Sequence, residues 1–255
     1  MILRRLTKHI KDQNWFAVLL DFFIVVVGIL IAFQITNWSA ELTLRGQEAG
    51  VMQSIAEDLR NDERQLIEGI DTAVINIQAA NFALHAASRP VADNITFLVD
   101  SSDTIGNLLT APSWQEFDPK LTNKLWQLSV SRFYPVQSNS AFGSLVAGGN
   151  LGLLQNQDLI RQLQIYQRRW SDIEVSQDLT YRPFRNQTAF VGQKFGLSMF
   201  TDIPQEQLVS LLSDNPELEG ALRNLAEYSI IHHAQLVEAI KVTRELLVYL
   251  GKTTT

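Results

Sequence analysis

Residues Trp15 to Ile35 read WFAVLLDFFIVVVGILIAFQI, and this apolar run sets the architecture of the chain. At about 1.5 Å per residue, a helix of this length spans about 32 Å, close to the roughly 30 Å of a bilayer's hydrocarbon core. Trp15 and Trp38 stand at its two ends, where indole rings favour the headgroup level, so both are candidate interface anchors. The sequence therefore predicts a transmembrane helix over residues 15–38.

Two other interpretations of this run stay open. A core helix of a soluble protein is rarely apolar on every side over such a length. A cleaved signal peptide carries a shorter apolar region, about 7–15 residues, followed by a cleavage site with small residues. Gln34 to Trp38 continue the run without a convincing site of that kind. We therefore expect an uncleaved signal anchor.

The charges that flank the run predict its orientation. Four basic residues precede it, and only one acidic residue opposes them: Arg4, Arg5, Lys8 and Lys11 against Asp12. Because positive charge favours the cytoplasmic side, residues 1–14 are expected to be a basic cytoplasmic tail. Residues 39–255 then form an exported domain, which is periplasmic in a Gram-negative cell. The net charge of −6 divides into +2 for residues 1–38 and −8 beyond them.

Asp21 is the single charged residue within the run. At 100° per residue, Gly28 lies about 20° to one side of Asp21 and Ala32 about 20° to the other. Gly28 and Ala32 also have the small-xxx-small spacing that lets two helices approach closely. One interpretation is a transmembrane homo-oligomer with Asp21 in the contact, or Asp21 paired with a polar group of another membrane protein. The other is a chance spacing, with Asp21 protonated or reaching the interface.

The segment from Asp21 to Trp38, with its GILIA stretch and its Gln34, Asn37 and Trp38 ending, resembles the opening of a bacterial family of uncharacterised single-span membrane proteins. Residues 142–156 are similar to that family's middle signature, although Tyr166-Gln167 replaces its tyrosine pair. The resemblance covers roughly residues 15–175 and implies a bacterial inner-membrane location. The family has no assigned activity, so the resemblance implies no catalytic residue.

Beyond residue 38 the sequence predicts an all-α domain. Helical periodicity predicts three long helices, at about 41–88, at 156 or 157 to 200 with a kink at Pro183, and at 216–250 with Gly251 as the stop. Shorter helices are expected near 92–110, 119–131 and 138–148, although residues 130–134 could instead be extended. The expected architecture is an antiparallel bundle of three long helices and several short ones.

Composition and motifs exclude several chemistries. The absence of cysteine excludes disulfide scaffolds and cysteine nucleophiles, and the acidic balance argues against a nucleic-acid binder. Residues 143–148 have the spacing of a phosphate loop, but Gly149-Asn150 replace its lysine and hydroxyl residue. His232 and His233 point about 100° apart on a helix, so they do not chelate one ion together. We expect His232 in the core, with metal binding or pH sensing as the alternative, and we predict no cofactor.

Two groups of charged residues suggest helix contacts. The first long helix carries an acidic group: Glu57, Asp58, Asp62, Glu63, Glu68 and Asp71. The second carries a basic group: Arg161, Arg168, Arg169, Arg182 and Arg185. One interpretation is attraction between neighbouring helices together with solvated faces. The other is that the arginines contact anionic lipid headgroups or an acidic partner.

These features together predict a function class. Without a catalytic motif, the chain is expected to be a non-enzymatic interaction or scaffolding protein. Its expected partners are the lipid bilayer and a second copy or another membrane protein, and not nucleic acid. The alternative is a ligand-sensing helical domain that signals through a membrane partner. A cleft at Trp114, Trp126 or Trp170 with convergent polar groups would favour sensing. An enzyme without a recognisable motif has the weakest support.

Overall fold

The structure is a computed structural model that describes residues 15–98, 105–200 and 202–253. It is mostly helical with two short strands, which confirms the predicted all-α class. The chain divides into two compact units, one up to Val51 and one from Met52 onward. The predicted basic tail, residues 1–14, lies outside the described residues.

Helix α2, Trp15–Ala86, is the longest element, with 72 residues. We expected one helix to end near Trp38 and a second to begin near Glu41, and this boundary is wrong. No proline or glycine lies between those two positions to interrupt the helix. Ser39 is an interior residue of α2, and its carbonyl accepts a hydrogen bond of 3.0 Å from the Thr43 hydroxyl.

The end of α2 is closed by a Schellman turn. Ser88 has φ of 55°, in the left-handed region. The N–H groups of Ser88 and Arg89 donate to the carbonyls of His85 and Leu84, each at 2.9 Å. These bonds satisfy carbonyls that the helix leaves free at its end. Pro90 follows, in agreement with the predicted stop.

In the first unit, α2 is exposed over almost all of residues 18–51. An 18-residue window of it has a mean hydropathy of 2.7, and none of that window is buried. Within the described residues it is the one helix long and apolar enough to cross a membrane. Its place near the N-terminus fits a membrane span and a signal sequence equally.

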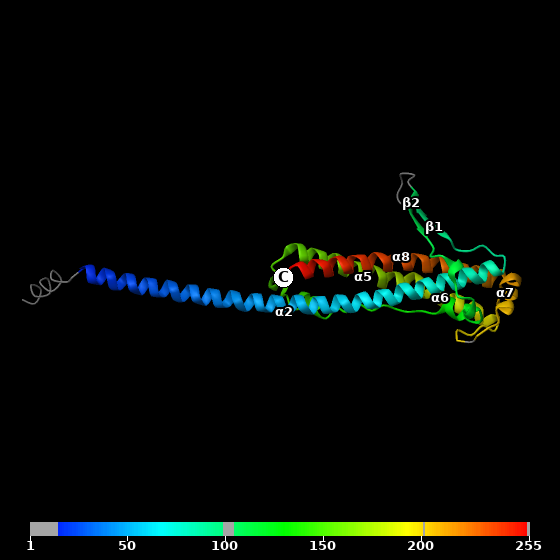
Figure 1. Ribbon diagram of the computed structural model, residues 1–255, viewed down its shortest axis with the longest axis horizontal. Coiled ribbons are helices and arrows are strands. Elements are labelled where there is room, and N and C mark those ends of the chain that lie inside the picture. Colours follow the sequence, from blue (N-terminus) through cyan, green and yellow to red (C-terminus); the bar gives the residue numbers. More distant parts are fainter. Residues whose placement is uncertain (1–14, 99–104, 201, 254–255) are drawn as a thin grey trace, which may run out of the picture. The chain divides into compact units, whose positions relative to one another are not determined.

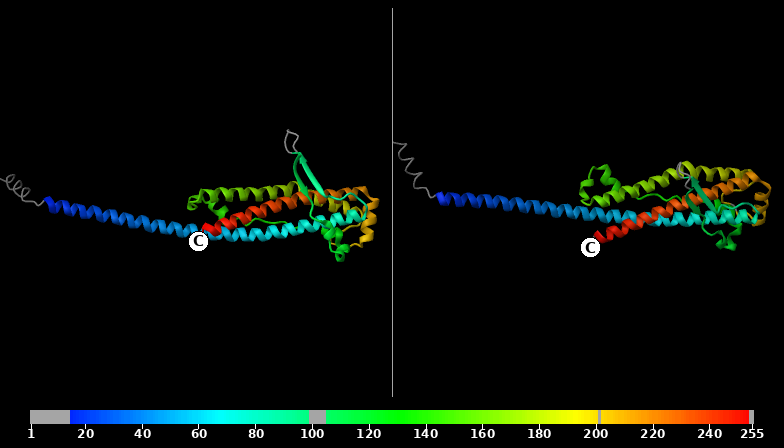
Figure 2. Two further views of the ribbon diagram at one scale, coloured as in Figure 1. Left: turned by 45° about the horizontal axis from the view of Figure 1, so that its top comes forward. Right: turned by 90° about the horizontal axis from the view of Figure 1, so that it is seen from above.

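In the second unit, the later part of α2 lies beside three helices (Figures 1 and 2). They are α5 (Gln157–Ser176), α6 (Arg182–Lys194) and α8 (Pro216–Thr253). Helix α7 (Gln205–Asp214), which we did not predict, lies at the end of the bundle where α2 finishes. The shorter segments are η1 (Trp114–Glu116), η2 (Pro119–Lys124), α3 (Leu125–Val130), α4 (Ala141–Ala147) and η3 (Leu151–Leu153).

A π turn joins α5 to α6 in place of the simple kink expected at Pro183. This turn, η4, spans Gln177–Tyr181 and leads directly into α6, where Pro183 occupies the first turn. A proline lacks the N–H of a helical residue, and its ring collides with the carbonyl four residues earlier. The wider π turn relieves this conflict without ending the helical path.

The ends of α5 and α6 have clear local causes. Asn156 caps α5, because its Oδ1 accepts a hydrogen bond of 3.1 Å from the N–H of Leu159. The predicted end at Phe200 is wrong, since α6 ends at Lys194. Gly196 has φ of 78° and supplies the left-handed residue that closes α6.

Helix α8 begins at Pro216 as predicted. Its inner face is buried, at Leu218, Leu222, Leu225, Ser229, His232, Leu236 and Ile240. The main core lies where the first half of this helix meets the last turns of α2, α3, α6 and α7. The expected stop at Gly251 is wrong, because α8 continues to Thr253.

The helix expected over residues 92–110 is wrong, because this region forms a β-hairpin. Strand β1 (Asn94–Leu98) pairs antiparallel with β2 (Ile105–Thr110), with Ile95 opposite Leu109. A buried side chain of α2 holds its base: Asn81 donates to the carbonyl of Ala92 at 2.8 Å and accepts from its N–H at 2.9 Å. This clamp satisfies both backbone groups of Ala92 in an extended chain.

Candidate functional site

The predicted contact residues of the apolar run all lie on α2. Asp21, Gly28 and Ala32 are exposed, and Trp38 is 64% exposed. Trp15 is the first residue of the helix, but the structure does not describe its side chain. Because the segment is helical throughout, Asp21, Gly28 and Ala32 share one side of it, as the spacing predicted. We call this side the Asp21 face.

The Asp21 face continues past the apolar run, which the sequence reading had missed. Around the axis of a regular helix, Gly46 lies at the same angle as Gly28. Ser39 lies within about 20° of that angle and Gly50 within about 40°. A β-carbon placed on any of these three glycines would meet no atom of the described residues within 4 Å. Packing within the described part of the chain therefore does not require glycine at these positions.

The five predicted arginines have three kinds of surroundings. Three form ion pairs with residues three or four positions away along α5, η4 and α6: Arg161–Asp158 at 3.1 Å, Arg169–Asp172 at 3.9 Å and Arg182–Asp178 at 2.9 Å. Arg168 is exposed on α5. Arg185 is half-buried, and its Nε donates to the carbonyl of Val130 at 2.9 Å. Burial, and then the charge of Arg132, lower the pKa of Arg185.

The acidic group of α2 makes contacts that differ from the expected attraction to these arginines. Glu63 pairs with Arg244 of α8 at 2.6 Å. Asp58 accepts hydrogen bonds from the N–H groups of Ser140 (3.1 Å) and Ala141 (2.8 Å), at the start of α4. These acidic residues therefore hold α8 and a loop against α2, and the ion pairs of the arginines are local to α5, η4 and α6.

Two buried polar groups inside the bundle had no clear signal in the sequence. Asp62 is completely buried and accepts hydrogen bonds from the Tyr166 hydroxyl and from the N–H of Ser138. Burial raises the pKa of Asp62 more than these hydrogen bonds lower it. The pKa of Tyr166 is also raised, first by burial and then by the charge of Asp62. This group ties α2 to α5 and to the segment before α4.

The second buried group surrounds His232, which is 3% exposed, in agreement with its predicted core position. The amide nitrogen of Gln177 lies within hydrogen-bonding distance of its ring nitrogens. The ring of Tyr181 stacks on it with 5.0 Å between centroids, and the Tyr181 hydroxyl donates to Asn76 of α2 at 3.0 Å. Burial, and then His233, lower the pKa of His232 to about 4. Gln177 of the π turn therefore contacts α8, and Tyr181 contacts both α8 and α2.

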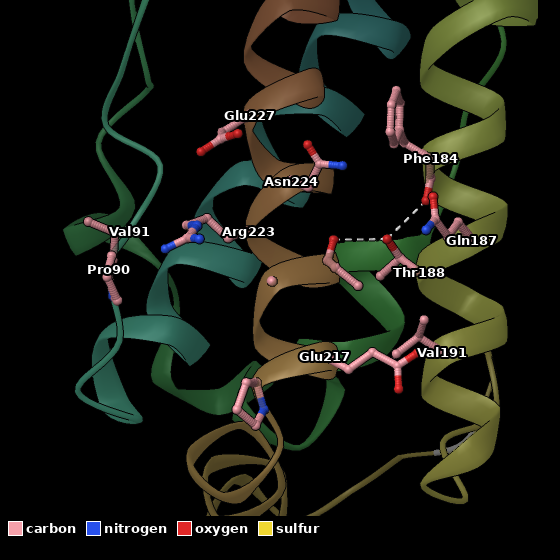
Figure 3. Close-up of a pocket in the computed structure, with 13 residues that line it drawn as sticks. Pro90, Val91, Phe184, Gln187, Thr188, Val191, Glu217, Arg223, Asn224 and Glu227 are labelled. Carbon is pink, nitrogen blue, oxygen red and sulfur yellow. Dashed lines mark hydrogen bonds between the residues drawn. The ribbon is translucent and has the colours of Figure 1, made fainter.

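Three hollows of the second unit, as far as its residues are described, could hold a ligand. A groove of about 680 Å³ lies between α6, α8 and residues 90–91. Figure 3 shows Asn224 directed toward α6, and Arg223 and Glu227 on the other side of α8, toward Val91. Among the charged residues that line it, Arg223 pairs with Glu219 at 3.3 Å and Glu217 pairs with Lys194 at 2.5 Å.

A smaller cleft of about 230 Å³ lies beside Trp170. Its polar lining residues are Tyr134, Gln137, Asn139 and Glu174. The third hollow, about 790 Å³, lies between α5 and α8 and is lined by residues that include Leu109, Ile173 and Gln235. Of the three tryptophans predicted to mark a sensing cleft, Trp170 lines one. Trp126 is buried in the core, and Trp114 packs against the ring of His85 with 4.6 Å between the ring centroids.

Within the described residues, no group of three His, Asp or Glu side chains lies close enough to hold a metal ion. The chain matches no family model, no curated protein and no solved structure. The family resemblance of residues 15–175 therefore stays a prediction.

Proposed function

We propose that this chain is a non-enzymatic interaction or scaffolding protein of a bacterial inner membrane, anchored by residues 15–38 of α2. In this proposal the residues before the anchor are cytoplasmic, and the helical domain beyond it is periplasmic. The anchor associates with a second copy through the Asp21 face. The observation that carries the proposal is the alignment of Asp21, Gly28, Ala32 and Gly46 on one exposed side of a continuous helix.

The energetic cost of this face supports a partner. A glycine inside a helix is about 1 kcal/mol less favourable than alanine, and packing against the described residues gives no steric reason for glycine at Gly28 and Gly46. A carboxylate in the bilayer adds about 2.5–3.5 kcal/mol at the centre and less toward the interface. A second helix offsets both costs, because small residues allow close backbone contact and a partner's polar group can pair with Asp21.

A continuous helix also suits a scaffold. Because α2 is continuous over Trp15–Ala86, the anchor and the first helix of the second unit are parts of one helix. Copies that associate through their anchors therefore hold their helical domains near one another. This proximity raises the effective concentration of any surface on those domains.

Cross-linking in native membranes tests the proposed association. Gly28→Leu fills the Asp21 face and should abolish the cross-linked oligomer. Val26→Leu is the matched control, since residue 26 lies about 160° away around the helix, and it should leave the oligomer intact. An oligomer unchanged by Gly28→Leu would refute the contact through this face. The anchor itself is tested by the mass of the purified chain, since loss of an N-terminal peptide would identify a cleaved signal sequence.

Orientation has a separate test. A reporter that works only outside the cytoplasm should be active when it is fused after Thr255. Activity of a reporter that works only in the cytoplasm, at the same position, would reverse the proposed topology.

The cleft beside Trp170 favours ligand sensing as the second candidate function. Its volume of about 230 Å³ accommodates a small molecule, and Gln137, Asn139 and Glu174 offer donors and acceptors around the indole. A library of small polar metabolites can be screened by the thermal unfolding of the full-length protein. A hit whose effect disappears in Glu174→Gln would support sensing at this cleft, whereas a hit unaffected by that change would place binding elsewhere.

A further inference from the structure

The β-hairpin has an unusual combination of exposed backbone and neutral side chains. Its sheet has two strands, so β1 and β2 each keep one outer edge. Among the described residues, the backbone of β1 hydrogen-bonds only to β2. Figure 1 shows the hairpin projecting away from the helices of the second unit, and the first view of Figure 2 agrees. The outer edge of β1 therefore offers free N–H and C=O groups to another strand.

The hairpin lacks most of the features that usually protect such an edge. Residues 94–98 and 105–110 contain no charged residue and no proline, although these are the common means of preventing edge pairing. The irregularity in register lies between Thr96 and Leu98, so the pairs from Asn94 to Thr96 are regular. The base of the hairpin packs against α8, with Ile95 and Leu109 against the core, so the hairpin keeps its conformation while its outer edge stays open.

We propose that β1 pairs antiparallel with β1 of a second copy, which forms a four-stranded intermolecular sheet in the order β2-β1-β1-β2. A two-fold contact of this kind places the same surface on both sides, so the strand must be compatible with itself. β1 meets this condition, because a neutral strand does not repel its own copy. It fits better than β2, since Gly106 and Asn107 of β2 are weak strand residues.

The strand length defines the register. All five residues of β1 overlap only when Thr96 of one copy lies opposite Thr96 of the other. Ile95 then lies opposite Phe97, and Asn94 opposite Leu98. A threonine pair is favourable across strands. Thr96 is exposed in the single chain, so the substitutions that test this register do not disturb the core.

This inference deepens the proposed self-association and rests on it in one respect. A short strand edge gives weak pairing in dilute solution, and anchoring in one membrane supplies the effective concentration that weak pairing needs. The Asp21 face and the β1 edge are separate contacts in separate units of the chain. Each can therefore be tested without the other.

Engineered cysteines test the register directly, because the natural chain contains none. In full-length protein oxidised in membranes, Thr96→Cys should form a disulfide-linked dimer, since directly opposed residues lie within disulfide range. Asn94→Cys is the control: in this register its two copies lie about 14 Å apart along the strands, so it should not cross-link. Cross-linking of Asn94→Cys equal to that of Thr96→Cys overturns the proposal, as does cross-linking of Leu108→Cys on β2 instead.

A cysteine in the anchor separates this inference from the proposed function. Ala32→Cys reports contact through the Asp21 face. Dimers at Ala32 without dimers at Thr96 overturn the strand pairing and leave the anchor contact standing. Dimers at Thr96 without dimers at Ala32 support the strand pairing and overturn the anchor contact. Absence of both overturns both.

A charge pair gives a second readout that needs no disulfide. Thr96→Lys places two lysines opposite each other and should abolish the association of two differently tagged copies, measured by cross-linking in membranes, when Gly28→Leu has removed the anchor contact. Mixing a Thr96→Lys copy with a Thr96→Glu copy in the same background should restore it, because opposite charges now face each other. Equal cross-linking of the lysine–lysine and lysine–glutamate pairs overturns the proposed register.

Discussion

Gly192 of α6 lies directly against the indole of Trp126 in α3. A β-carbon at residue 192 would fall 2.2 Å from the ring atom Cζ2 and 2.6 Å from Cη2. Trp126 is 1% exposed and is part of the main core, so its ring has little room to move. This contact fixes the distance between α6 and α3, because only a residue without a side chain lets them approach so closely.

Gly192→Ala should therefore destabilise the second unit by about 1–3 kcal/mol, which is typical of overpacking in a closed core. Denaturant unfolding of the full-length protein, followed by tryptophan fluorescence, measures the loss. Gly220→Ala is the matched control, since a β-carbon at residue 220 of α8 meets nothing within 4 Å. It should be neutral or stabilise by up to about 1 kcal/mol. Equal effects of the two substitutions would contradict the packing argument.

The long helices were predictable because their inner faces repeat over many turns. The buried face of α8 is the clearest example, since Leu218, Leu222 and Leu225 continue through Leu236. The hairpin was not predictable in the same way. A short apolar run such as residues 94–98 fits a strand or a helix equally, and the clamp from Asn81 that keeps the chain extended comes from another element.

Partners distant in sequence also explain what was missed in the candidate sites. Asp62 belongs to a cluster of acidic residues that looks solvated from the sequence. It is buried because Tyr166, 104 residues away, covers it and donates to it. The continuation of the Asp21 face to Gly46 could have been found from the sequence. It required extending the angular count past Trp38, where we expected the helix to end.

The clamp at the base of the hairpin gives a second prediction. Asn81→Ala removes both hydrogen bonds to Ala92 and leaves a buried N–H and a buried carbonyl without a partner. We expect a loss of stability of about 1–3 kcal/mol and faster hydrogen exchange in β1. Gln78→Ala is the control, because Gln78 donates to the carbonyl of Ser113 at an exposed position. Its effect should be under about 1 kcal/mol. Unchanged exchange in β1 of Asn81→Ala would contradict the clamp.

His232 predicts how stability depends on acid. Its pKa is lowered to about 4 in the folded chain by burial and then by His233, whereas an unfolded histidine has a pKa near 6.5. As pH falls from 6.5 to 4, the unfolded chain binds a proton that the folded chain does not. The free energy of unfolding should therefore fall by about 3 kcal/mol across this window.

His232→Gln should remove most of this slope in urea titrations between pH 7 and 4. His233→Gln is the comparison. Burial also lowers the pKa of His233, so it contributes in the same direction, but His233 is only partly buried. A larger change of slope in His233→Gln than in His232→Gln would show that the buried ring is not the main source.

Asp62 predicts an opposite dependence. Its folded pKa lies above the unfolded value because burial outweighs its hydrogen bonds. At neutral pH, where the side chain is a carboxylate in the unfolded chain, burying this charge lowers the free energy of unfolding. Its contribution to stability increases as pH falls through the folded pKa. Asp62→Asn should abolish that increase and keep an acceptor for Ser138.

Asp62→Ala should be much worse than Asp62→Asn, since it leaves the Tyr166 hydroxyl and the Ser138 N–H buried without an acceptor, at about 1–3 kcal/mol each. The neighbouring residue supplies the control. Glu63 pairs with Arg244, whose side chain is 57% exposed, and exposed pairs contribute under about 1 kcal/mol. Glu63→Ala should therefore cost little, and that small cost should shrink in high salt. Comparable losses for Asp62→Ala and Glu63→Ala would show that the buried carboxylate does not hold α5 against α2.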